Sequence, residues 1–424
     1  MREMKSSGLP WVDNIPEGWK IARGKEILTL LSRPVEPTDG VITCFRDGEV
    51  TLRSKRRELG FTFSTQETGY QGIEPGDLVI HGMDGFAGSI GISDSRGKAT
   101  PVLNVMDSNQ NKKYLMYYFR AIAKAGYFES VATGIRVRTC DTNWNKISVT
   151  PCLVPPLDEQ SRIASFLDSH IAKIDDSIAR YKALSDKLDE YRYNVISKIT
   201  CVGIREKKLF TPLNNEFLDR LPKDWEYKRL KFTSVEIFKG DGITKDEVDV
   251  NGNIPCIRYG EIYSKYDIAC SKCYSLTNLE AHTSPKYAVY GDLLLAGTGE
   301  LIEDIGKNIV YLGSQPCLVG GDIIVVRHNQ NPKFLSYALN SHYARAQKSK
   351  GKSKLKVVHI SASEIGNIRV AIPPLDEQAE IVAYLDKKCS DIDSSKEKIE
   401  AVVKKLEEYK KSLIYNAVTG KIEC

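Results

Sequence analysis

The sequence predicts an α+β protein: two strand-rich α/β domains separated by two long helices, which pair as an antiparallel coiled coil and give the chain a pseudo-twofold internal repeat. The hexapeptide PPLDEQ occurs twice, and each copy opens a long stretch without proline or glycine. A glycine-punctuated segment of mixed character precedes each copy, and 424 residues are too many for one ordinary core. We expect a first domain at 1–156, a first helix at 157–204, a second domain at 205–372 and a second helix at 373–424.

The two PPLDEQ copies, Pro155–Gln160 and Pro373–Gln378, mark a repeat with a spacing of 218 residues. The same spacing carries Leu167 onto Leu385 downstream, whereas matching motifs upstream are 206 to 220 residues apart. Six matching residues followed by further matches in the same frame are improbable by chance. The domains have therefore diverged by insertion and deletion, while the helices have kept a common length.

A heptad pattern runs through both predicted helices. Apolar side chains recur at alternating steps of four and three, which is the spacing of a coiled-coil seam, and Lys, Asp and Glu fill the outward positions. A glycine follows each helix, at Gly203 and Gly420, where its tolerance of positive φ suits a helix C-terminus. The predicted seam residues are Leu167, Ile171, Ile174, Ile178, Leu188 and Val195 in the first helix, and Leu385, Ile392, Ile399, Val403, Leu406 and Leu413 in the second.

An antiparallel pairing of these helices would place one domain at each end. A helix of about 43 residues is roughly 65 Å long, which is close to two turns of B-DNA at ~34–36 Å each. A heptad seam alone is more often a dimerisation coil or one face of a bundle helix. The duplicated domains favour instead a spacer between two equivalent heads.

Basic residues cluster at corresponding places in the two domains, although the net charge is only +5. The segment Gly134–Thr139 carries two arginines, and its counterpart Lys348–Lys356 carries five lysines and no acid. Such clusters can neutralise phosphates by counterion release, and arginine can read guanine edges, although a solvated loop is the alternative interpretation. The predicted DNA-binding residues are Arg53, Lys55, Arg56, Arg57, Arg136, Arg138, Thr298, Lys350, Lys352, Lys354 and Lys356.

Catalytic signatures are missing from the sequence. It has no G-x-x-x-x-G-K-[ST], no N-P-P-Y or D-P-P-Y, and no G-x-G-x-x-G after a strand. Cys270 and Cys273 form a lone C-x-x-C without a second pair, which is weak support for a metal site. We therefore expect no catalytic residue and no metal site, while a sparse Asp/Glu/Lys nuclease constellation stays open as an alternative.

The expected location is the cytoplasm, without a membrane partner. No apolar run approaches the ~20 residues that a membrane span needs. The N-terminal residues lack the apolar core of a signal peptide, and the ten cysteines show no disulfide-framework spacing.

Together these features resemble the specificity subunits of type I restriction-modification systems. The resemblance rests on the two PPLDEQ helices, the Gly-Asp-Leu strands at Gly76 and Gly291 with their glycine-rich turns, the tryptophans Trp19 and Trp225 near each domain's start, and the basic loops. It covers nearly the whole chain. The arginine-bearing first loop departs from the lysine-rich second one, so contacts cannot be transferred from one domain to the other.

The resemblance implies a non-catalytic subunit of a bacterial or archaeal defence system. Each domain would be a target-recognition domain that reads one half of a gapped, asymmetric site in double-stranded DNA, and the helices would set the gap and dock two methyltransferase (modification) subunits. Restriction subunits would complete the complex, and S-adenosylmethionine, ATP and Mg²⁺ would bind those partners and not this chain. The alternatives are a coiled-coil scaffold with two protein-binding heads, a stand-alone DNA-binding regulator and a stand-alone nuclease.

Overall fold

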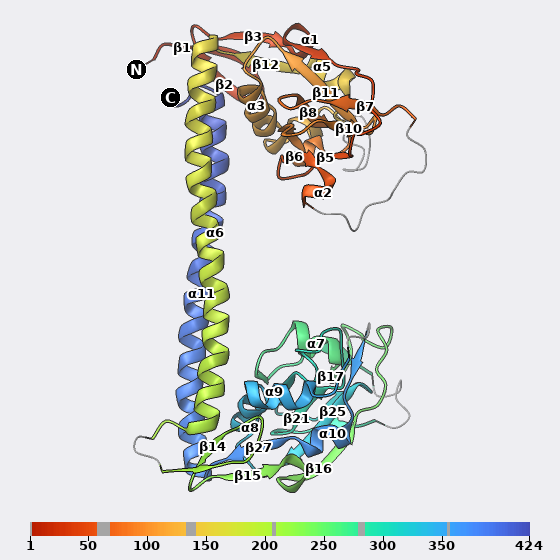
Figure 1. Cartoon of the computed structure of the whole chain (residues 1–424), viewed down its shortest axis with the longest axis vertical. Coiled ribbons are helices and arrows are strands. Elements are labelled where there is room, and N and C mark those ends of the chain that lie inside the picture. Colours follow the sequence, from red (N-terminus) through yellow and green to blue (C-terminus); the bar gives the residue numbers. More distant parts are fainter. Residues whose placement is uncertain (1, 57–67, 133–140, 206–208, 279–284, 354–356) are drawn as a thin grey trace. The chain divides into compact units, whose positions relative to one another are not determined.

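The computed structural model describes residues 2–56, 68–132, 141–205, 209–278, 285–353 and 357–424. Two helices of 46 and 44 residues, α6 (Leu157–Val202) and α11 (Leu375–Val418), run through it (Figure 1). The chain divides into two compact units. Unit 1 comprises Met1–Lys182 and Glu400–Cys424, and unit 2 comprises Ala183–Ile399. Each unit therefore holds one α/β domain together with part of each long helix.

The domain of unit 1 is built on a four-stranded antiparallel sheet. Its strands, in spatial order, are β4 (Leu28–Leu30), β11 (Leu103–Ser108), β8 (Leu78–His81) and β9 (Ile90–Ile92). Helix α3 (Lys112–Lys124) contacts β8 and β9 and buries Tyr114, Tyr118 and Phe119 in the core. Shorter elements complete the domain: β5 (Ile42–Cys44) with β6 (Val50–Leu52), β7 (Gln71–Ile73) with β10 (Gly97–Ala99), α1 (Gly24–Ile27), α2 (Arg53–Arg56), α4 (Tyr127–Ser130) and α5 (Trp144–Val149).

The domain of unit 2 repeats this sheet and adds a strand. Its order is β16 (Ser234–Lys239), β25 (Ile323–His328), β21 (Leu293–Ala296), β23 (Asn308–Tyr311) and β18 (Ala269–Cys270). Strand β21 occupies the position of β8, so the two Gly-Asp-Leu motifs open equivalent strands. A second sheet contains β19 (Ser275–Thr277), β17 (Ile254–Ile257), β24 (Cys317–Val319) and β20 (Tyr287–Ala288). The helices are α7 (Tyr259–Ser264), α8 (Pro332–Leu339), α9 (His342–Ser349) and α10 (Ala362–Asn367).

The Gly-Asp-Leu motif has the same structural role in both domains. Its glycine adopts positive φ, +89° at Gly76 and +93° at Gly291, which permits the tight turn into the strand. The buried aspartate that follows is held by an arginine: Arg327 Nη2 lies 3.0 Å from Asp292 Oδ2, and Arg33 pairs with Asp77 in the same way. The repeat thus preserves an ion pair between a buried aspartate and a half-buried arginine at the start of the central strand.

Hydrogen bonds of the PPLDEQ motif connect each domain to its long helix. In unit 1 the indole N–H of Trp19 donates to Glu159 over 3.1 Å, and Gln160 Nε2 donates to the Pro155 carbonyl over 2.8 Å. In unit 2 the same bonds join Trp225 to Glu377 over 3.0 Å and Gln378 to Pro373 over 2.9 Å. The acid and the amide are buried in both copies. The motif recurs because burying these polar groups requires the same set of partners each time.

Strand pairs at the base of each domain lead into these motifs. Strand β3 (Lys20–Arg23) pairs with β12 (Pro151–Val154), and β15 (Glu226–Arg229) pairs with β27 (Arg369–Ile372). Hairpins precede both pairs: β1 (Met4–Leu9) with β2 (Val12–Pro16), and β13 (Phe210–Pro212) with β14 (Arg220–Pro222). The repeat therefore includes the connection to the helix as well as the sheet.

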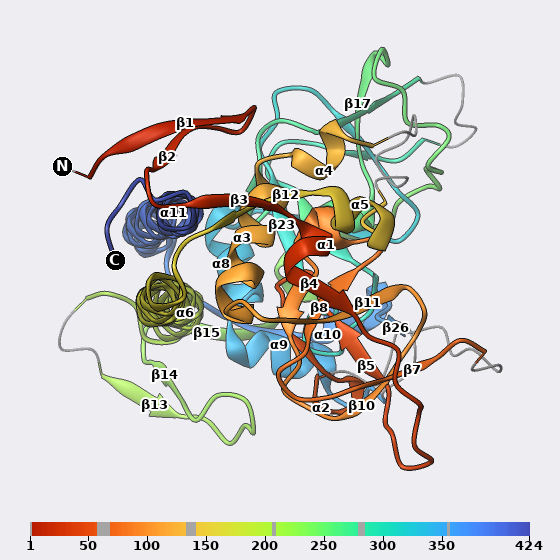
Figure 2. The same ribbon diagram turned by 90° about the horizontal axis from the view of Figure 1, so that it is seen from above.

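Helices α6 and α11 lie side by side, as the end-on view in Figure 2 also shows, and two ion pairs between them show that they are antiparallel. In unit 1, Asp175 of α6 pairs with Lys410 of α11 over 2.7 Å. In unit 2, Asp189 pairs with Lys396 over 2.6 Å, so the partner's number falls by fourteen as that of α6 rises by fourteen. The predicted fold class is confirmed.

All the predicted seam residues are buried or half-buried. Some have a further role, because Leu167 and Leu385 also belong to the hydrophobic cores of the two domains. Ile196 and Ile199, which the heptad pattern did not select, are buried as well. No helix within the described ranges is long and apolar enough to cross a membrane.

Candidate nucleic-acid interface

The domain of unit 1 has a cleft of about 920 Å³ beside the turn that follows β8. Three arginines line it, Arg46 from the loop after β5 and Arg53 and Arg56 from α2, together with His81 at the end of β8. Burial lowers the pKa of His81, so its ring is neutral at physiological pH. The arginines therefore carry the positive charge of this cleft.

Carboxylates and an aromatic ring hold the arginines of this cleft in place. Arg56 pairs with Asp47 over 2.6 Å and with Glu49 over 2.8 Å, and its guanidinium lies 4.0 Å from the centre of the Phe45 ring. The hydrogen bond from Arg56 lowers the pKa of Asp47. Arg46 pairs with Asp84 over 2.8 Å. The guanidinium groups are thus oriented at the surface, where phosphates or base edges could replace the carboxylates.

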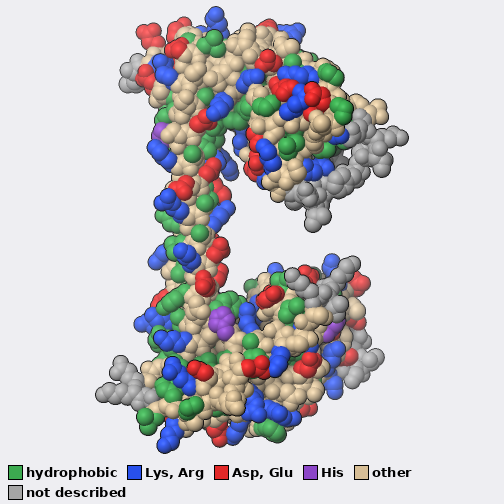
Figure 3. Space-filling view, in the orientation of Figure 1, with side chains coloured by type: hydrophobic (Ala, Val, Ile, Leu, Met, Phe, Trp, Pro, Cys, Tyr) green, Lys and Arg blue, Asp and Glu red, His purple; other side chains and the backbone are tan. Residues whose placement is uncertain are grey.

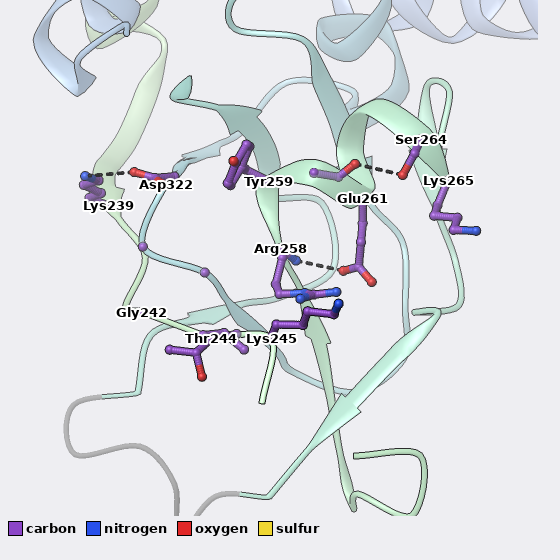
Figure 4. A pocket seen from close by; sticks show the side chains of 14 residues that line it. Lys239, Gly242, Thr244, Lys245, Arg258, Tyr259, Glu261, Ser264, Lys265 and Asp322 are labelled. Atoms are coloured by element: carbon purple, nitrogen blue, oxygen red, sulfur yellow. Dashed lines mark hydrogen bonds and ion pairs between the residues drawn. The ribbon is translucent and has the colours of Figure 1, made fainter. Parts of the chain in front are cut away.

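The domain of unit 2 has a cleft of about 700 Å³ with a different lining (Figure 4). Four of its cationic side chains are Lys239 at the end of β16, Lys245, Arg258 and Lys265. The Arg258 backbone N–H donates to Glu261 over 2.8 Å, which places the arginine at the N-terminus of α7. Among the described residues, Arg258 Nε is a buried donor without an acceptor. The Arg258 side chain thus lines the cleft while its Nε is buried.

A smaller cavity of about 330 Å³ continues this cleft, since Lys239 and Asp322 line both. It contains Thr298, which comes directly after the turn at the end of β21 and is paired with β26 (Val358–His359) through β22 (Thr298–Gly299). The Thr298 hydroxyl lies 3.1 Å from His359 Nδ1. The turns that follow the equivalent strands β8 and β21 thus border a cavity in each domain.

The predicted DNA-binding residues that the structure describes fall into two groups. Arg53, Arg56 and Thr298 line the clefts. Lys55 lies outside them and contacts Asp94 over 3.3 Å and Ser95 over 2.6 Å.

Lys350 and Lys352, two described lysines of the second basic loop, contact acids of their own unit. Lys350 pairs with Glu216, and Lys352 donates to Glu364 over 2.6 Å and to the His359 carbonyl over 2.7 Å. Lys352 thereby borders the smaller cavity that Glu364 and His359 line. Arg57, Arg136, Arg138, Lys354 and Lys356 lie outside the described residues.

Lys348, the first lysine of Lys348–Lys356 and not among the predicted DNA-binding residues, has a structural role. Lys348 belongs to α9 and is buried in the core, where its Nζ donates to the carbonyls of Gly306 over 2.6 Å and Leu339 over 2.8 Å, and to Asn308 Oδ1 over 3.1 Å. Burial lowers its pKa well below the usual value. Its carbonyl cage joins α9 to the sheet, so the lysine is structural.

Sequence reasoning missed several cleft residues, namely Arg46, Lys239, Lys245, Arg258 and Lys265. None of them lies in a local cluster of basic residues that would mark it in the sequence. The glycines near Lys239, at 240 and 242, were the one available signal of a loop that could approach a ligand. Within the described residues, no group of three or more His, Cys, Asp or Glu side chains could hold a metal ion.

Charge on the surface is mixed in sign. Figure 3 shows lysine and arginine interspersed with aspartate and glutamate along α6, α11 and both domains on the visible face. One network in unit 1 illustrates this pattern: Arg96 pairs with Glu36 over 2.9 Å and with Asp39 over 3.1 Å. On this face, the described residues form no single broad field of positive charge.

Two α/β domains of one topology, each with a cation-lined cleft and each joined to one of two paired helices, form an arrangement suited to the recognition of DNA. The profile of the family described as "Type I restriction modification DNA specificity domain" matches residues 222–405. The chain is 22% identical to the type I restriction enzyme EcoKI specificity subunit of Escherichia coli, across 96% of this chain and 90% of the relative. It is also 22% identical to the MjaVIII specificity subunit of Methanocaldococcus jannaschii, across 82% of this chain and 80% of the relative.

Solved structures show the same fold. One, from a study of complex assembly and conformational transition of the type I R-M system, has a TM-score of 0.73 at 17% identity and covers 96% of this chain and 99% of its own. The HsdS subunit from Thermoanaerobacter tengcongensis has a TM-score of 0.52 at 17% identity, with 96% and 98% covered. These comparisons confirm the resemblance to type I restriction-modification specificity subunits seen in the sequence, and residues 222–405 match the DNA specificity domain of that family.

Proposed function

We propose that each domain reads one half of a gapped DNA site, that α6 and α11 set the spacing between the halves, and that the helices dock two modification subunits. The observation that carries the proposal is the cation-lined cavity beside equivalent strands, β8 and β21, in two domains of the same topology. Because one cleft presents arginines and the other mainly lysines with one arginine, the two half-sites differ in sequence. The full site is then asymmetric.

Recognition by such clefts combines two kinds of contact. Lysines and backbone amides bind phosphates and fix the register, while a few arginine, threonine or amide side chains read base edges. The ordered guanidinium of Arg56 in unit 1 and that of Arg258 in unit 2 are the readers we assign, since arginine forms bidentate bonds to guanine. Lys245 and Lys265 are assigned to phosphates.

Exposed apolar side chains at repeated positions support docking on the helices. Leu157 and Leu375, the leucines of the two PPLDEQ motifs, are 56% and 60% exposed. Tyr191 and Tyr409, which also share the 218-residue spacing, are 49% and 55% exposed. Two copies of one partner would require the same apolar contacts twice, and a buried interface core offsets the cost of exposing these side chains.

In this proposal the chain itself performs no chemistry. S-adenosylmethionine binds the modification subunits, which methylate adenine on each strand, and ATP and Mg²⁺ bind the restriction subunits. The complex acts in the cytoplasm of a bacterium or archaeon. The chain's contribution is to place the partners at one DNA sequence.

Mapping of adenine methylation tests the proposal. A host that carries this gene with its modification subunit is expected to show one gapped, asymmetric methylated motif, and deletion of this gene is expected to remove it. An expressed modification subunit with no lost motif would contradict DNA reading and favour a protein-binding scaffold. DNA cleavage by the purified chain with Mg²⁺ alone would favour a nuclease, and tight sequence-specific binding without a modification subunit would favour a regulator.

A further inference from the structure

Unit 1 contains a groove of about 560 Å³ between α3 and the two long helices. Its floor is apolar, formed by the buried side chains of Ala121 and Ile178 and the half-buried Ile414. Lysines and an arginine border it together with the acids Asp175 and Glu407. The cationic residues at its border are Arg120, Lys124, Lys182, Lys410 and Lys411.

The internal repeat shows what covers the equivalent surface in unit 2. The 218-residue spacing relates Lys411, Ser412 and Tyr415 of the groove to Tyr193, Asn194 and Ser197 of α6. In unit 2, α9 forms a hydrogen bond with each of these three residues. Arg345 Nη2 donates to the Tyr193 hydroxyl over 2.8 Å, and the His342 backbone N–H donates to Ser197 Oγ over 2.8 Å. His342 Nε2 lies 3.2 Å from Asn194 Oδ1.

Unit 1 lacks this cover because α3 continues where its counterpart ends. Helix α8 stops at Leu339, and Asn340 turns the chain by donating to the carbonyls of Asn308 and Ser336 over 3.0 and 3.1 Å. The chain then re-enters a helix as α9. Helix α3 continues through the corresponding positions to Lys124, so no second helix covers the surface of α6 and α11 that lines the groove.

The charge of the groove indicates the chemistry of its occupant. Among the residues that the structure describes, Lys182 and Lys411 pair with no acid, and Arg120 and Lys124 donate to backbone carbonyls, of Asp47 and Ala87. Burial lowers the pKa values of Arg120 and Lys124, which reflects a charge poorly compensated by its surroundings. A carboxylate-bearing partner would compensate these charges, and apolar side chains would fill the floor.

We propose that this groove binds an acidic, amphipathic helix of one modification subunit, in the place that α9 fills in unit 2. This inference rests on the proposed function and adds to it that the two modification subunits bind non-equivalently. A helix in an apolar groove is a common mode of recognition, and α9 is a precedent on the same surface of this chain. The DNA backbone fits less well, because phosphates gain nothing from the apolar floor.

Zero-length carbodiimide cross-linking of the assembled complex, followed by mass spectrometry, tests the proposal directly. Amide cross-links are expected from Lys182 and Lys411 to aspartate or glutamate side chains of a modification subunit. Protection of these lysines from acetylation by DNA alone, or their cross-linking to a second copy of this chain, would overturn the proposal.

Measurements of modification-subunit binding to variants of this chain provide a second test. Lys182→Glu combined with Lys411→Glu is expected to weaken the binding of one of two modification subunits at least tenfold and leave the other unchanged. Ala125→Trp, which blocks the groove without a change of charge, is expected to have the same effect. The control is Lys20→Glu with Lys25→Glu, which reverses the same charge on exposed residues of unit 1 outside the groove. Equal loss of both subunits, or none, would overturn the groove assignment, whereas failure of the unmodified chain to bind any modification subunit would contradict the proposed function itself.

Discussion

At the scale of single residues, the molecule relies on polar groups buried in repeated settings. The buried Glu159 accepts hydrogen bonds from the Trp19 indole over 3.1 Å and from Arg2 over 2.7 Å. A buried carboxylate is stable only while such donors persist. The PPLDEQ glutamate is therefore a structural residue that links domain and helix.

Trp19→Phe keeps the ring but removes the donor to Glu159. We expect it to reduce the free energy of unfolding of unit 1 by about 1–3 kcal/mol, the usual cost of taking a partner from a buried polar group. Urea unfolding followed by circular dichroism measures this change. Trp144→Phe, at a half-buried position of the same domain, serves as the matched control. Equal losses in the two variants would contradict a specific role for the indole N–H.

We expect the stability of unit 2 against unfolding to depend on pH through His328. Burial lowers its pKa to about 4, whereas an unfolded histidine has a pKa of about 6.5. Between these values the unfolded chain binds the additional proton, so the stabilisation is complete above pH 6.5 and is lost as the pH falls toward 4. His328→Gln is expected to flatten the fall in melting temperature over this window. Parallel curves for the two proteins would show that other groups cause the acid sensitivity.

The two kinds of cleft residue in unit 2 should respond differently to removal. Lys245→Ala is expected to weaken DNA binding uniformly and to reduce the slope of log K against log salt by about one. Arg258→Ala is expected to cost ~1–3 kcal/mol and to relax the preference at one base pair. Titration of the assembled complex with matched and mismatched DNA at several salt concentrations measures both. Lys223→Ala, an exposed lysine outside the cleft, should change neither.

At the scale of elements, the antiparallel helix pair was predictable because its signal is local and repetitive. The heptad pattern, the missing proline and glycine, and the identical spacing of both copies all depend on neighbours in sequence. The clefts were less accessible because strands distant in sequence assemble them. Arg258 and Lys239 line the same cleft only because the folded domain brings their segments together. Lys348 is buried, although its neighbours in sequence indicate an exposed loop.

The helix pair also yields a prediction about spacing. We insert one heptad after Leu184 in α6 and one after Glu400 in α11, positions that the Asp175–Lys410 and Asp189–Lys396 pairs place at one level. Seven residues lengthen a helix by about 10 Å, which is roughly three base pairs at 3.4 Å each. The methylated motif is expected to gain about three unspecified positions and keep both half-sites.

A heptad inserted in one helix alone supplies the control. It shifts α6 against α11 and separates the ion-paired residues of one unit, so the chain should lose stability rather than gain spacing. If the double insertion altered a half-site and left the gap unchanged, the helices would not be the spacer. Methylation mapping of the host genome distinguishes these outcomes.

At the scale of the whole molecule, the two units are variants of one design. Both join a sheet of the same strand order to a long helix through the same buried glutamate and glutamine. They differ where a ligand would bind, in the lining of the clefts and in the groove that α9 fills in only one of them. Structural sameness and chemical difference are what an asymmetric reader of DNA requires.

Replacement of residues 205–372 by a second copy of residues 1–154 tests this design. Because the PPLDEQ junction is identical in both units, the copied domain should attach to α11 through the contacts it makes to α6. Antiparallel helices relate the copies by a twofold axis, so the methylated motif is expected to become an inverted repeat of the first half-site around an unspecified gap. Methylation mapping reads the motif directly. A direct repeat would contradict the twofold relation, and retention of the original second half-site would show that unit 2's domain does not determine it.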